Sequence, residues 1–189
     1  KDPHISGGRI SSEDFVRELL LHIGDVSVCS KLFKRDLIGS QRFDETKLNE
    51  DLLFVIDLLP KIDCIAFTGK VGYYYLCRTD SISSRYGKAI EDMVGNSLLF
   101  RRIALNIFPE LDKEANRFVL FQHMAYLLLI PDSMQNKDNR LYQSAKKYVR
   151  RKFLSEGLFN GFLSLRDKII LCGQIFIPKY LSKYYQKRH

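Results

Sequence analysis

The chain of 189 residues contains no tryptophan and only four cysteines, and no two of these form a Cys-x-x-Cys pair. They are scattered at Cys29, Cys64, Cys77 and Cys172. Such spacing gives neither a zinc-binding motif nor the disulfide framework of a small secreted domain. The cysteine pattern therefore predicts a reducing, cytosolic environment.

Histidine is equally scarce and dispersed, at His4, His22, His123 and His189. No two of them have the spacing of metal ligands on a helix or in a turn. We predict no protein-built metal site, and packing or solvation as the role of each histidine.

A long apolar run is absent as well. The best candidate, residues 118–130, is 13 residues long and includes Gln122 and His123. A helix that spans a bilayer needs about 20 mostly apolar residues, so this run predicts a buried helix instead. Residues 1–8, KDPHISGG, contain neither the apolar core of a signal peptide nor an initiator methionine. We expect from this that the chain begins inside a longer protein.

Positive charge is abundant but unevenly distributed, with a net charge of +8. Residues 1–85 hold 12 Lys and Arg against 13 Asp and Glu, whereas residues 86–189 hold 18 against 9. Such asymmetry indicates an anionic partner, either nucleic acid or a lipid surface, or a well-solvated helical surface. The change predicts a boundary near residue 86 and two domains, 1–85 and 86–189.

The first half predicts two helices and three short strands. Ser11 and Ser12 can cap a helix over 13–24, and a second helix begins after Asn49 and ends at Pro60. Apolar and β-branched residues predict strands at 26–33, 64–69 and 71–78. Three short strands would leave much unpaired sheet edge, so we expect missing strands upstream and self-association of the chain.

The second half predicts only helices, at 89–108, 113–130, 138–154 and 165–188. Pro109, Pro131 and Gly157 interrupt them. The predicted fold class is therefore α/β (α+β) and mainly helical, with a partial sheet and flanking helices followed by an α-helical bundle.

Two adjacent carboxylates, Glu50 and Asp51, begin the apolar segment NEDLLFVIDLL. On a helix, Glu50 shares a polar face with Asp57 and Lys61, whereas Asp51 shares an apolar face with Val55. Both acids could simply complement the positive end of the helix dipole. A carboxylate on an apolar face must also be hydrogen-bonded, paired or open to a cleft, because burying it bare is costly.

Three segments in order carry a resemblance: VCSKLFKRDLIGSQRFDE at 28–45, NEDLLF at 49–54 and GYYYLCRTDSIS at 72–83. Together they resemble the second half of the GT-A catalytic domain of bacterial family 2 glycosyltransferases, the enzymes of capsule, exopolysaccharide and lipopolysaccharide synthesis. The matching positions are Lys31, Leu32, Phe33, Arg42, Phe43, Glu50, Asp51, Tyr73, Tyr74, Tyr75, Arg78 and Ser81 to Ser83. Cys29 and Ser30 depart from the tryptophan and asparagine usual in that family.

The resemblance implies that Asp51 is the general base of an inverting sugar transfer to a glycan or lipid-linked acceptor hydroxyl. It implies acceptor-side or supporting roles for Glu50, Lys31 and Arg78. From the residues alone, Lys31 can equally be a strand-end lysine, Arg78 can pair with a core acid, and the tyrosines can be strand packing.

The family binds its nucleotide-sugar and a divalent metal, Mg²⁺ or Mn²⁺, through an upstream Asp-x-Asp half. No Asp-x-Asp occurs here. We therefore expect an acceptor-side portion that binds no cofactor and is inactive by itself.

The basic terminal segment 165–189 interleaves apolar residues with lysine and arginine. An amphipathic helix of this kind can lie on an anionic membrane surface, which predicts peripheral contact with the inner face of the membrane. A solvated bundle helix is the alternative. Two non-enzymatic function classes also stay open: an adaptor at a membrane surface that carries an inactive transferase remnant, and a basic helical module that binds nucleic acid. The second is disfavoured because no helix-turn-helix or RNA-binding signature is present.

Overall fold

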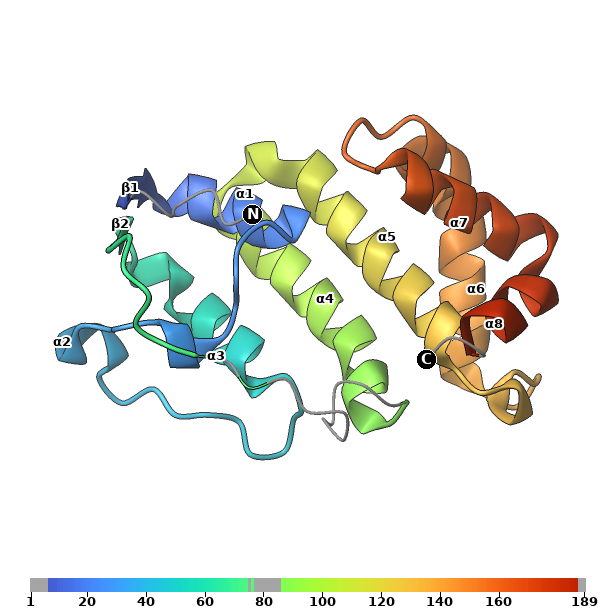
Figure 1. Ribbon diagram of the computed structural model, residues 1–189, viewed down its shortest axis with the longest axis horizontal. Helices are drawn as coiled ribbons and strands as arrows, with labels where there is room; N and C mark the ends of the chain where they lie inside the picture. The colour runs from blue at the N-terminus through green and yellow to red at the C-terminus, as the bar shows by residue number, and fades with distance from the viewer. Residues whose placement is uncertain (1–6, 75, 77–85, 187–189) are drawn as a thin grey trace.

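The computed structural model describes residues 7–74, 76 and 86–186, and its fold is mainly helical (Figure 1). The first region contains β1 (Gly8–Ser11), α1 (Ser12–Leu21), the 3₁₀ turn η1 (Val28–Ser30), α2 (Arg35–Ile38), α3 (Glu50–Leu58), the 3₁₀ turn η2 (Leu59–Lys61) and β2 (Cys64–Phe67). The second contains α4 (Lys88–Ile107), the 3₁₀ turn η4 (Pro109–Leu111), α5 (Asp112–Leu129), the 3₁₀ turn η5 (Asp132–Met134), α6 (Arg140–Lys152), the π-helical turn η6 (Phe153–Leu158), α7 (Leu165–Phe176) and α8 (Pro178–Gln186). The predicted mainly helical class is confirmed.

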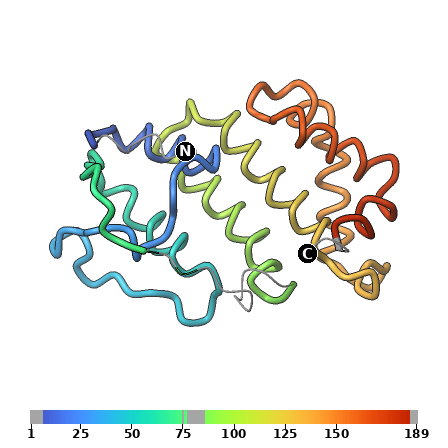
Figure 2. Tube along the Cα trace, viewed as in Figure 1, coloured from blue at the N-terminus to red at the C-terminus, as the bar shows by residue number. Residues whose placement is uncertain are grey.

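Helix α5 is the central element of the molecule. It packs against α1 and α4 on one side and against α6, α7 and α8 on the other. The chain trace shows the same order, with the β strands at one end and the helices after residue 140 at the other (Figure 2). Because α5 contacts both groups, it fixes their relative positions.

One apolar core joins the first region to α4 and α5. Phe15, Leu19 and Ile56 pack in the same cluster as Phe100 and Phe118. Two further clusters lie around Tyr126 and around Leu171 in the second region. The domain boundary near residue 86 stays a prediction, and the two regions share buried side chains across it.

The predicted start of the first helix is confirmed. Ser11 is the N-cap of α1, and its Oγ accepts a hydrogen bond from the amide of Asp14 at 3.0 Å. The helix ends at Leu21, before the predicted Gly24, and its C-cap His22 has the left-handed conformation (φ 58°). Helix α3 also occurs as predicted, but the side chain of Asn49 makes no cap and instead donates to the carbonyl of Ala89 at 2.9 Å.

The predicted strand at 26–33 is wrong, because this segment forms the 3₁₀ turn η1. Ser27 Oγ accepts from the amide of Cys29, and Ser30 Oγ donates to Asp25. Such local side-chain bonds compete with strand pairing.

The predicted strand at 71–78 is also not found where the structure describes it. Residues 71–74 lie outside any strand, with Val71 and Tyr74 mostly exposed, while residue 75 and residues 77–85 lie outside the described residues. Gly69 turns the chain with φ 65° two residues after the end of β2.

The sheet therefore has two strands among the described residues. β1 pairs antiparallel with β2, with Ile10 opposite Ile65. β1 was not predicted, and the expected larger sheet is not present in this part of the chain. Self-association through a sheet edge stays a prediction.

The last predicted helix is divided in two. α7 ends at Phe176 and α8 begins at Pro178. Proline has no amide hydrogen and its ring clashes with the preceding helical turn, which explains the break.

Candidate functional site

Asp51 lies in the first turn of α3 and is half-buried. Its Oδ2 accepts a hydrogen bond from the amide of Val28 at 3.1 Å. Among the described residues, its other oxygen Oδ1 has no hydrogen-bond partner. The carboxylate is thus oriented through one oxygen, by a segment 23 residues earlier in the chain, and keeps the other oxygen available.

Lys31 lies beside this carboxylate, just after η1. Its Nζ donates to the carbonyl oxygen of Ser27 at 2.7 Å and lies 3.7 Å from Oδ2 of Asp25. Only 19% of the Lys31 side chain is exposed. Burial lowers the pKa of the Lys31 ammonium, while the carboxylates of Asp25 and Asp51 act in the opposite direction.

Asp25 is the residue of this site that sequence reasoning missed. Its carboxylate accepts hydrogen bonds from the amide of Ser27 at 2.9 Å and from Oγ of Ser30 at 2.7 Å. Burial acts to raise the pKa of Asp25, but these hydrogen bonds and the nearby Lys31 outweigh burial and lower it. The Asp-x-Ser spacing is typical of an Asx turn and could have indicated this fold.

Glu50 is exposed, as its predicted helical face requires. No hydrogen bond or ion pair of Glu50 occurs among the described residues. The structure therefore separates the two adjacent acids, with Asp51 in the site and Glu50 on the surface. Arg78 lies outside the described residues, so its predicted role stays a prediction.

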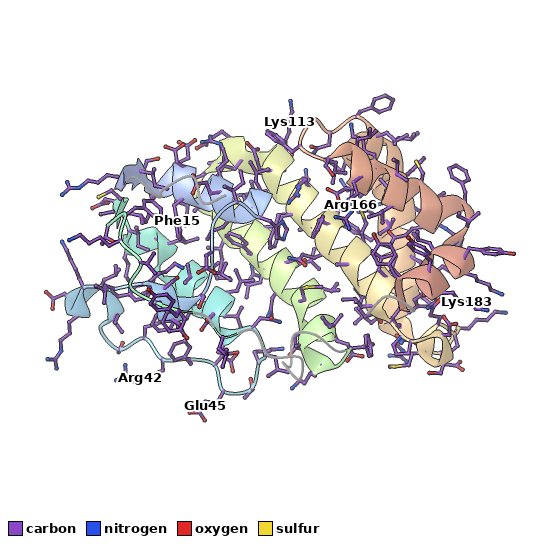
Figure 3. The ribbon with its side chains drawn as sticks, in the orientation of Figure 1. Phe15, Arg42, Glu45, Lys113, Arg166 and Lys183 are labelled. Atoms are coloured by element: carbon purple, nitrogen blue, oxygen red, sulfur yellow. The ribbon has the colours of Figure 1, made fainter. Side chains whose placement is uncertain are left out.

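Aromatic side chains bring the matching segments together beside α3. The ring of Phe54 stacks on Phe43 at 4.5 Å and meets the edge of Phe33 at 5.8 Å. Arg42 points outward from the loop that precedes α3 (Figure 3). The segment 28–45 thus packs against α3, which contains most of the segment 49–54. In the third matching segment, Tyr73 and Tyr74 are exposed.

A second polar cluster lies between α1 and α5. The ring of His22 stacks on Phe118 at 4.9 Å, and its Nδ1 lies 2.6 Å from Nη1 of Arg117. Burial, together with the Arg117 guanidinium, lowers the pKa of His22 to about 4. A neutral imidazole whose Nδ1 accepts from arginine and whose ring stacks on Phe118 is a packing residue, in line with the sequence prediction.

The described residues contain no group of three or more His, Cys, Asp or Glu side chains placed to hold a metal ion. Two hollows lie in the second region. One lies between α5, α6, α7 and α8 beside Lys146 and Gln174, and one of about 200 Å³ lies between α5 and α7 beside Arg166. Neither is lined by Asp51 or Lys31.

Within the described ranges, every helix is too short or too polar to cross a membrane. Comparison of the chain with protein-family models, curated protein sequences and solved structures finds no match.

Proposed function

We propose that this chain is the acceptor-side portion of an inverting glycosyltransferase that moves a sugar from a nucleotide-sugar to an acceptor hydroxyl. The observation that carries the proposal is the carboxylate of Asp51, with Oδ2 held by the Val28 amide and Oδ1 available. A general base needs this combination of fixed orientation and a free acceptor atom. The ordered sequence resemblance supplies the reaction class.

In this mechanism Oδ1 of Asp51 accepts the proton of the acceptor hydroxyl. The acceptor oxygen forms a bond to the anomeric carbon as the bond from that carbon to the diphosphate oxygen breaks. The nucleoside diphosphate leaves with the electron pair of that bond, and the anomeric configuration inverts. Positioned proton transfer of this kind contributes about 10² to 10⁴ in rate.

Lys31 acts as a positioning residue in this proposal. Its ammonium fixes the carbonyl of Ser27 at 2.7 Å, and Ser27 begins the turn whose Val28 amide orients Asp51. The ammonium also places a positive charge near the carboxylates of Asp25 and Asp51. The hydrogen bond to the Ser27 carbonyl holds the turn, and with it the base, in one orientation before the substrate arrives.

Among the described residues, no group of three or more His, Cys, Asp or Glu side chains is placed to hold the divalent metal that the resemblance implies. No step of the proposed mechanism in this chain runs through a metal. Metal and nucleotide-sugar would be bound by the upstream half that the resemblance leads us to expect.

The test is an assay of the full-length protein with a panel of nucleotide-sugars, Mg²⁺ or Mn²⁺, and a lipid-linked glycan extract. We expect release of a nucleoside diphosphate and a product of inverted anomeric configuration by NMR. The 189-residue chain by itself is the matched control, in which we expect no release and no tight nucleotide diphosphate complex in calorimetry. Retained configuration, or no release with any donor, would overturn the proposal.

A further inference from the structure

The outer side of α7 presents an apolar stripe. Leu165, Ile169 and Phe176 are 76%, 65% and 71% exposed. At about 100° per residue they fall within about 40° of one another around the helix axis. Leu171 is fully buried, and Ile170 and Ile175 pack against the same core cluster as Leu171. Leu165 and Ile169 therefore lie on the side of α7 away from Leu171, and Phe176, whose ring also meets the edge of the Phe153 ring at 6.0 Å, extends this exposed stripe to the end of the helix.

Cations flank this stripe and continue along α8. By the same spacing, Arg166 and Lys168 lie on either side of the α7 stripe. On α8, Tyr180 is 80% exposed and lies next to the exposed Lys179 and one helical turn from the exposed Lys183. Lys183 points outward from α8, and Arg166 lies on the side of α7 next to α5 (Figure 3).

The excess positive charge of the chain is concentrated in the same part. Residues 131–189 hold 13 Lys and Arg against 4 Asp and Glu, whereas residues 1–130 hold 17 against 18. Helix α6, which packs on α5 beside α7 and α8, carries exposed Lys147, Arg150 and Arg151. Exposed apolar side chains and a local cationic excess thus occur together in α6–α8.

We propose that the outer face, defined as Leu165, Ile169, Phe176, Tyr180, Lys179 and Lys183, docks on an anionic lipid surface. Isoleucine, leucine and phenylalanine side chains can enter the acyl boundary, tyrosine suits the headgroup level, and the lysines pair with lipid phosphates. The proposal rests on α7 and α8 and is independent of the chemistry at Asp51. It would hold the proposed transfer site at a membrane that carries its acceptor.

Charge complementarity favours this occupant over the alternatives. A second copy of the chain would bring the same positive face against itself, and like charges oppose such pairing. A nucleic acid would use the lysines but gives no reason for the exposed Leu165, Ile169 and Phe176, because phosphate contacts dominate such binding.

The experiment measures co-sedimentation of the full 189-residue chain with vesicles of phosphatidylcholine, and of phosphatidylcholine mixed with phosphatidylglycerol. Ile169→Gln/Phe176→Gln/Tyr180→Gln removes apolar contact without changing charge, and Lys179→Gln/Lys183→Gln removes charge alone. Leu98→Gln, at an exposed leucine of α4, is the matched control. Circular dichroism melting verifies that each variant is folded.

We expect binding to the mixed vesicles only, with a partition coefficient that falls about fivefold for each lysine removed. The apolar triple variant should lose at least about tenfold, because each buried methylene contributes to partition, while Leu98→Gln binds like the wild type. Equal binding to neutral vesicles, no binding, or an unchanged triple variant would overturn the proposal. So would a dimer in ultracentrifugation that the triple variant dissolves, or tighter binding to duplex DNA than to the mixed vesicles.

Discussion

The first turn of α3 and the outer face of α7 and α8 use charge in opposite ways. At α3, Asp51, Lys31 and Asp25 are tied to backbone groups of η1 and its flanks at fixed distances. On the outer face, Lys179 and Lys183 are exposed beside apolar side chains. A fixed, partly desolvated carboxylate suits chemistry at one atom, whereas exposed cations suit attraction to an extended surface.

The two sites nevertheless depend on one packing scaffold. Helix α3 packs on α4, α4 packs on α5, and α5 contacts α7 and α8. A change in α5 or its partners should therefore affect the stability of the whole chain. A change confined to Asp51 should alter only the proposed sugar transfer, and a change confined to the outer face should alter only the proposed lipid binding.

The largest expected stability effect comes from acid acting on the contact between α1 and α5. His22 has its pKa lowered to about 4, against 6.5 in the unfolded chain. Between pH 6.5 and 4 the unfolded state gains a proton that the folded state does not, so stability is full above pH 6.5 and falls toward pH 4. The loss should be about 3 kcal/mol from this group.

Urea unfolding of the wild type and of His22→Asn at pH 7 and pH 4 measures that contribution. Asparagine tolerates the left-handed conformation of residue 22 and does not titrate. The variant should show a shallower dependence of unfolding free energy on pH. If the unfolding free energy of both proteins depended on pH in the same way, His22 would not be a source of the acid sensitivity.

A smaller effect is expected where η6 supports α7. A Cβ at Gly157 would overlap Cδ2 of the fully buried Leu171. Gly157→Ala should cost about 1–3 kcal/mol, because an overpacked core forces shifts in its neighbours. Gly161→Ala is the matched control, since nothing lies within 4 Å of its Cβ, and thermal melting compares the two. Equal melting temperatures would show that Leu171 can move freely.

The smallest effects concern matched helix caps in the two regions. Ser11 caps α1 and Ser164 caps α7, with Oγ to amide distances of 3.0 and 3.1 Å. Each Ser→Ala change should cost about 1 kcal/mol. If the regions unfold together, both variants should lower one shared transition in calorimetry by similar amounts. If Ser164→Ala alone showed a second, separate unfolding transition, the molecule would consist of two units that unfold independently.

The sequence predicted the helices well because their signals are local. Apolar periodicity and the serine at position 11 are sufficient to place α1, and Pro178 could have indicated the break between α7 and α8. β1 was missed because it is four residues long and its partner β2 lies more than fifty residues away. The segment 26–33 was misassigned because the hydrogen bonds of Asp25, Ser27 and Ser30 override its apolar alternation.

For the candidate site, helical spacing correctly separated the half-buried Asp51 from the exposed Glu50. It could not show that Asp51 bonds the amide of Val28, since that contact depends on how η1 packs against α3. The place of Lys31 next to Asp25 follows from the same turn. Tertiary packing, which single-sequence patterns do not encode, decides these contacts.

The most direct test of the central claim compares the turnover of Asp51→Asn and Glu50→Gln in the proposed full-length glycosyltransferase. Asparagine is nearly isosteric and its amide oxygen can still accept from Val28, so the fold should persist while the proton acceptor is lost. We predict a fall in turnover of at least about a hundredfold for Asp51→Asn, or about 2.7 kcal/mol, with substrate affinity little changed. Glu50→Gln should stay near the wild type. If both variants kept wild-type turnover and only lost about 0.3–1 kcal/mol of stability, the two acids would be helix-dipole partners and Asp51 would have no part in the mechanism.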